Sequence, residues 1–174
     1  AQSCTFWSKV REQFQALQDE PEQQKIPRLF DLIGQLSART FVCDVSHNVD
    51  YARLLTEIDG IDLYLVHVVR DGRGMVHSRI RKDYRIGRLK AAMPVHVNRV
   101  FSVARRWLKN RQAFARLESK LGAKSVCIQY EELCRDPRTA LEPVGKCLGL
   151  DFSEIGQQLG AGQQLKRVPH LIRG

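Results

Sequence analysis

Arg70 and Ser78, eight residues apart in a basic stretch, are a residue pair suited to holding a phosphate group. A guanidinium offers forked, permanently charged donors to phosphate oxygens, and a hydroxyl adds a neutral donor. Arg70 follows an apolar run at 63–69, and a helix is expected from about 74 to 82. Ser78 is therefore expected about one turn into a helix whose start carries partial positive charge, so both side chains could reach one phosphate.

The charge of the chain also indicates an anionic partner. Lys and Arg total 28 against 19 Asp and Glu, a net charge of +9. Fourteen of the basic residues fall between Arg70 and Arg116, a region with two acids, Asp71 and Asp83. Such an excess favours nucleic acid, an acidic membrane, or a phosphorylated or sulfated small molecule or glycan. No run approaches the roughly 18 apolar residues of a membrane span.

Apolar runs and helical periodicities alternate along the chain. Buried strands are expected at 41–45, 63–69 and 124–130, where short apolar runs with β-branched residues end in polar segments. Apolar residues at helical spacing predict two helices before residue 37, followed by helices at about 48–58, 74–82, 94–117 and 137–148. Asn48 or Asp50 is expected to cap the third of these helices. This alternation predicts an α/β fold, a three-layer sandwich with a central parallel sheet, in one globular domain.

Ligands of open parallel sheets bind at the carboxyl ends of the strands, which here are residues 44–47, 70–73 and 130–132. His47 could serve as a general base there, since a histidine accepts a proton near neutral pH. His67, inside a strand, is interpreted as a packing residue. The five cysteines are scattered without a CxxC pair, a pattern that suggests neither a zinc site nor a disulfide framework.

Three segments together resemble the sulfotransferases that use 3′-phosphoadenosine 5′-phosphosulfate (PAPS). LYLVHVVRDGRGMVHSRIRK (63–82) looks like the family's strand-loop-helix that binds the 3′-phosphate, in which a Ser follows eight residues after the Arg. VARRWLKNRQ (103–112) is similar to its tryptophan-bearing helix. VCIQYEELCRDPRTALEPVGKCLGLDF (126–152) resembles the strand ending in Tyr-Glu-Asp-Leu, with Glu132 for the usual Asp. The three occur in the family's order.

The resemblance implies roles for individual residues and a P-loop NTPase-like version of the sandwich. Arg70 and Ser78 correspond to 3′-phosphate ligands, and Tyr130 to a residue near the adenine. Arg173 and Gly174 look like the start of a late basic loop that closes over the same phosphate. FVCDVSHN (41–48) matches a segment near the sulfuryl group, but His47 stands where the family has lysine. The family's Gly-rich 5′-phosphosulfate loop has no counterpart, so residues 1–174 are interpreted as a partial domain truncated at the N-terminus and also at the C-terminus, and inactive alone.

The implied activity is transfer of the sulfuryl group from PAPS to a hydroxyl or amine of a small-molecule or glycan acceptor, with 3′,5′-ADP as product and no metal. A cytoplasmic location is expected, or the Golgi lumen if an N-terminal anchor has been lost. Nucleic acid and membrane are not expected as partners, and the sequence does not indicate an oligomeric state. Two alternatives remain open at this point: a basic nucleic-acid-binding module, and a P-loop nucleotide kinase that uses Mg²⁺ and ATP.

Overall fold

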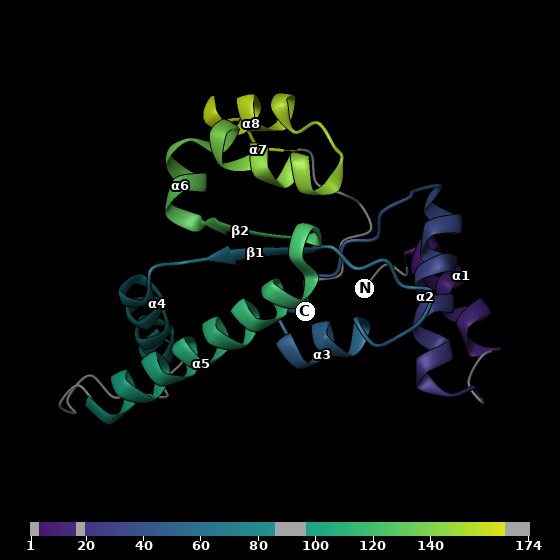
Figure 1. Ribbon diagram of the computed structural model, residues 1–174, viewed down its shortest axis with the longest axis horizontal. Helices are drawn as coiled ribbons and strands as arrows, with labels where there is room; N and C mark the ends of the chain where they lie inside the picture. Colours follow the sequence, from purple (N-terminus) through teal and green to yellow (C-terminus); the bar gives the residue numbers. More distant parts are fainter. Residues whose placement is uncertain (1–3, 17–19, 86–96, 166–174) are drawn as a thin grey trace. The chain divides into compact units, whose positions relative to one another are not determined.

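The structure, a computed structural model, describes residues 4–16, 20–85 and 97–165 (Figure 1). Their contacts divide them into two compact units, one reaching to Leu63 and the other spanning Tyr64–Leu165. The second unit contains both strands and most of the predicted site residues.

The first unit is helical. It comprises α1 (Thr5–Gln15), α2 (Glu22–Ser37) and α3 (Val49–Leu55), and α1 packs against α2. The two helices predicted before residue 37 are therefore confirmed. The Oδ1 atom of Asn48 accepts the backbone N–H groups of Asp50 and Tyr51 at 3.0 and 3.3 Å, so Asn48 is the N-cap of α3.

The second unit is built around two parallel strands, β1 (Leu65–Val69) and β2 (Ser125–Gln129). Direct partners run in register from Leu65 opposite Ser125 to Val69 opposite Gln129. Both apolar runs predicted to be strands here are confirmed, each slightly shorter than expected. The helical elements described around them are α4 (Gly72–Arg85), α5 (Val97–Leu121), a 3₁₀ turn (Gly122–Lys124), α6 (Tyr130–Arg135), α7 (Pro137–Leu148) and α8 (Ser153–Gly160).

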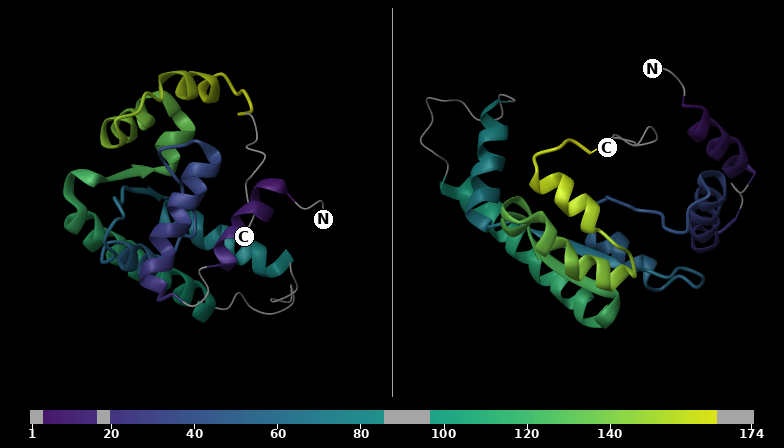
Figure 2. Two further views of the ribbon diagram at one scale, coloured as in Figure 1. Left: turned by 90° about the vertical axis from the view of Figure 1, so that its right-hand side faces the viewer. Right: turned by 90° about the horizontal axis from the view of Figure 1, so that it is seen from above.

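Helices α5 and α7 supply most of the core around the strands. α5 packs against both β1 and β2, α7 packs against β2, and α8 lies beside α7 (Figure 2). The buried apolar side chains of the second unit are Val103, Leu117, Ile128 and Val144. α7 has the predicted bounds, because Asp136 caps its start with Pro137 in the first turn, and Gly149 ends it at a φ of +65°.

A buried ion pair joins α4 to α5. Asp83 is 1% exposed, and Arg99 donates to its Oδ2 atom from Nε at 2.9 Å and from Nη2 at 2.5 Å. A buried carboxylate requires such charged donors. In the described part of the chain, neither these two helices nor any other is long and apolar enough to cross a membrane.

The predicted three-layer, P-loop NTPase-like sandwich is wrong for the structure described. The described chain is mostly helical, and its sheet has two strands. Residues 41–45 are exposed and pair with no described strand, although their composition suggested a third one. Val66 and Val68, on one face of β1, remain 38% and 47% exposed, so no described helix layer covers them as it would in a sandwich.

Candidate functional site

The carboxyl ends of β1 and β2 bring together two of the predicted site residues. Val69 lies opposite Gln129 at the end of the ladder, so the next residues, Arg70 and Tyr130, begin neighbouring segments. The guanidinium carbon of Arg70 lies 5.2 Å from the centre of the Tyr130 ring, which is a cation–π distance. Among the described residues Arg70 pairs with no carboxylate, so it differs from a structural arginine that holds a sheet edge.

The loop after β1 is fixed by its acidic residue. The carboxylate of Asp71 accepts the backbone N–H of Arg73 at 2.7 Å and its Nη2 at 2.8 Å. The side-chain hydrogen bond from Arg73, followed by the backbone one, lowers the pKa of Asp71 to about 2. The N–H of Asp71 in turn donates to Glu131 Oε1 at 3.0 Å. Asp71 therefore holds Arg73 and ties the loop to α6.

Ser78 lies on the same side of α4 as the Arg70 guanidinium. A Cβ atom built on Gly74 would stand 3.4 Å from Arg70 Nε, so the arginine side chain lies over the first turns of α4. Ser78 is four residues beyond Gly74 and so faces the same way. The residue is exposed. Ser78 lies further into the helix than expected, because α4 starts at Gly72 rather than near Gly74.

An open cavity of about 580 Å³ adjoins this strand end. Its lining includes Arg70, Trp107, Arg111, Gln129 and the acidic pair Glu131 and Glu132. The ring of Trp107 packs against the start of α4, since a Cβ on Gly72 would lie 3.1 Å from it. The two carboxylates make the α6 side of the cavity unfavourable for an anion, whereas the Arg70 side favours one.

Cys127 also lines this cavity, on the strand face against which α5 packs, and the residue is exposed. Burial, followed by the negative charge of Glu118, raises the pKa of its thiol, while Arg111 acts in the opposite direction. The protonated thiol is thus the favoured form near neutral pH, which argues against a nucleophilic cysteine. None of the five cysteines is joined to another by a disulfide in the structure.

The remaining predicted site residues lie elsewhere. His47 is exposed in the irregular segment between α2 and α3, with a φ of +54°, and belongs to the first compact unit. Its role as a base stays a prediction. Arg173 and Gly174 lie outside the described residues.

Several lining residues were missed by sequence reasoning. Trp107 and Arg111 project from one face of α5, four residues apart, and that spacing could have identified them as neighbours. Nothing in the sequence, however, specifies which face of a basic helix meets the strands. Comparison of the chain with protein-family models, with curated proteins and with solved structures gave no match.

Proposed function

We propose that this chain binds the 3′-phosphate end of PAPS. It thereby takes part in the transfer of the sulfuryl group from PAPS to a hydroxyl or amine of an acceptor. One observation carries the proposal. Arg70, at the carboxyl end of β1, lies against the Tyr130 ring and over the same face of α4 that presents Ser78. A forked cation and a hydroxyl on one face suit a phosphate, and an exposed aromatic ring beside them suits a nucleobase.

The role of the arginine in this site is electrostatic. A phosphate monoester carries close to two negative charges near neutral pH, and the guanidinium can bind two of its oxygens at once. Asp71 competes little for Arg70, because its carboxylate is already held by Arg73. Sulfuryl transfer itself requires positioning of donor and acceptor and positive charge near the leaving oxygen, without a covalent enzyme intermediate. Binding at Arg70 supplies the positioning.

A nucleotide titration tests the proposal directly. We expect 3′,5′-ADP to bind this chain at least about tenfold more tightly than 5′-AMP, which lacks the 3′-phosphate, because one charge-assisted hydrogen bond accounts for a difference of that size. Isothermal titration calorimetry in buffers with and without Mg²⁺ measures both affinities. The preference is expected to be the same in the two buffers, because Arg70 rather than a metal provides the charge.

Three results would contradict the proposal. Equal affinities for the two nucleotides would show that the 3′-phosphate is not recognised. A requirement for Mg²⁺ would instead favour the nucleotide-kinase alternative. Tight binding of single-stranded oligonucleotides with steep salt dependence, and no binding of mononucleotides, would assign the basic stretch to nucleic acid.

A further inference from the structure

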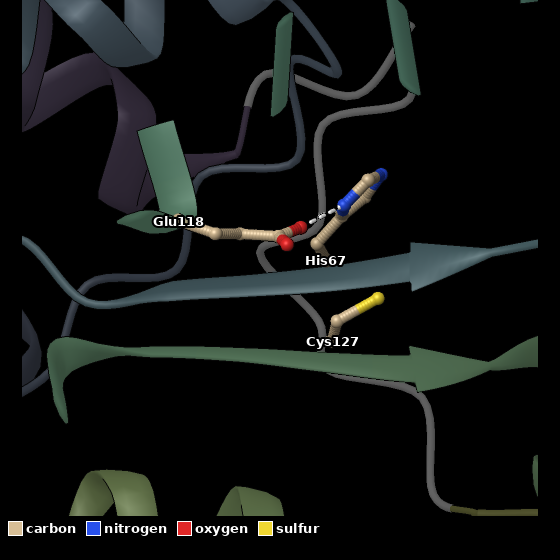
Figure 3. A group of neighbouring side chains, drawn as sticks. All are labelled: His67, Glu118 and Cys127. Carbon is tan, nitrogen blue, oxygen red and sulfur yellow. Dashed lines mark hydrogen bonds and ion pairs between the residues drawn. The ribbon is translucent and has the colours of Figure 1, made fainter. Parts of the chain in front are cut away.

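Three side chains of metal-binding type converge beneath α5 (Figure 3). They are His67 from β1, Cys127 from β2 and Glu118 from α5. One potential ligand atom of each, a ring nitrogen, a carboxylate oxygen and a thiol sulfur, lies within 4.8 Å of the other two. The cluster shares no residue with the Arg70 and Ser78 pair, although Cys127 lines the same cavity as Arg70.

The strand register creates the cluster. His67 and Cys127 are direct partners in the parallel ladder, and direct partners project from the same face of a sheet. The face is the one that α5 covers, because Phe114 of α5 stacks on the His67 ring with 4.6 Å between the ring centres. Glu118, one helical turn beyond Phe114, therefore reaches the same point.

The charges around the cluster restrict what it can bind. The Nδ1 atom of His67 contacts the Glu118 carboxylate, and both side chains are largely buried, at 13% and 19% exposure. Arg111 Nη1 lies 3.9 Å from the same carboxylate oxygen. A cation that enters here must therefore be compensated by at least two negative ligands, because a guanidinium is already nearby.

We propose that His67, Glu118 and Cys127 form a three-ligand site for a borderline-soft divalent cation of the Zn²⁺ type. Imidazole nitrogen, thiolate and carboxylate are ligands that Zn²⁺ accepts together, whereas Mg²⁺ and Ca²⁺ prefer oxygen alone. On binding, the Cys127 thiol loses its proton to solvent and becomes a thiolate. The two anionic ligands then neutralise the ion, so Arg111 is tolerated. Cys127 and Arg111 line the open cavity, which leaves a fourth position accessible to water or an anion.

No metal was expected from the sequence, because the three ligands are far apart along the chain. Metal sites are identified in sequences by ligands a few residues apart. Here His67 and Glu118 are 51 residues apart, and the ladder and α5 bring the three side chains together. The simpler interpretation is an ion pair between histidine and glutamate. The two interpretations are distinguishable, because an ion pair does not require Cys127.

Cobalt titration of the whole chain tests the site without any nucleotide, so its outcome is independent of the proposed function. Added Co²⁺ is expected to give a thiolate-to-cobalt charge-transfer band and the visible bands of a tetrahedral ion, at one Co²⁺ per chain, and Zn²⁺ is expected to displace it. Cys127→Ser should remove the charge-transfer band and weaken Co²⁺ binding at least about tenfold. The matched control is Cys43→Ser, a substitution of an exposed cysteine in the other unit, which should change neither.

If circular dichroism shows that Cys127→Ser does not fold, a labelling experiment on the unmodified chain tests the site instead. Iodoacetamide followed by peptide mass spectrometry should show that Zn²⁺ protects Cys127 from alkylation and leaves Cys43 reactive. A charge-transfer band that is absent, or that persists in folded Cys127→Ser, would overturn the site. Equal alkylation of Cys127 with and without Zn²⁺ would do the same, and His67 and Glu118 would then form an ion pair only.

Discussion

Replacement of Arg70 by alanine is expected to weaken 3′,5′-ADP binding by roughly 2–4 kcal/mol, because the phosphate then has no charge-assisted hydrogen bonds from a guanidinium in a partly desolvated site. The forked shape of the Arg70 guanidinium is expected to contribute to 3′,5′-ADP binding as well as its charge. Arg70→Lys keeps the charge but cannot bind two phosphate oxygens in one plane, so an intermediate loss is expected. Ser78→Ala should cost about 1 kcal/mol, the scale of one neutral hydrogen bond.

Two controls separate a specific interaction from a general loss of structure or charge. Affinity for 5′-AMP should change little in any of these variants, because that nucleotide lacks the 3′-phosphate. Arg116→Ala removes an exposed guanidinium of α5 that does not line the cavity, and it should weaken 3′,5′-ADP binding by less than about 0.5 kcal/mol. Calorimetry on the unmodified chain and the four variants gives all the values. Parallel losses for both nucleotides in folded Arg70→Ala would refute the assignment.

The buried pair between α4 and α5 predicts the second large effect. Arg99→Met should lower the free energy of unfolding of the second unit by about 3 kcal/mol, because it leaves the Asp83 carboxylate buried without its forked donor. Replacing both partners, as Asp83→Leu with Arg99→Met, should recover part of that loss, since no buried charge then remains. Arg73→Met is the matched control. It breaks an exposed Arg–Asp pair and should cost no more than about 0.5 kcal/mol.

Urea denaturation can report on the second unit alone. The chain has two tryptophans, Trp7 in the first unit and Trp107 in the second. In a Trp7→Phe background the tryptophan fluorescence therefore reports the unfolding of the second unit. Unfolding of the first unit then does not contribute to the measured transition. Equal stability losses for Arg99→Met and Arg73→Met would contradict the prediction and show that the buried pair contributes no more than the exposed one.

The local elements of this chain could be predicted because their signals are local. Asn48 was one of the two caps predicted for α3, and α7 begins at Pro137 as predicted, whereas its caps, Asp136 and Gly149, are seen only in the structure. The segment 41–45 was wrongly predicted to be a strand, because apolar composition describes what a strand buries but not whether a neighbouring strand is present to accept its hydrogen bonds. In the structure the Asp44 carboxylate accepts the N–H of Ser46, a local turn interaction, instead.

Some features of the candidate site could likewise be predicted from the sequence, and others could not. The proximity of Arg70 and Tyr130 follows from a general rule, since residues after parallel strands meet at one edge of a sheet. The buried environment of Asp83 and the approach of Glu118 to His67 depend on how α5 is rotated about its axis. Its apolar and basic residues leave several rotations possible, and only the packed structure selects one.

The register of β1 and β2 has a consequence for how fast the second unit folds. Leu65 lies opposite Ser125, so the first pairing of the strands closes a loop of about sixty residues, and the entropy of closing it is lost before the ladder forms. The packing of α7 on α6 and on α8 spans much shorter loops. We therefore expect the C-terminal helices to assemble early and β1 to dock late, in the rate-limiting step. Until then the edge of β2 is unpaired, and aggregation during refolding is expected to begin at that edge.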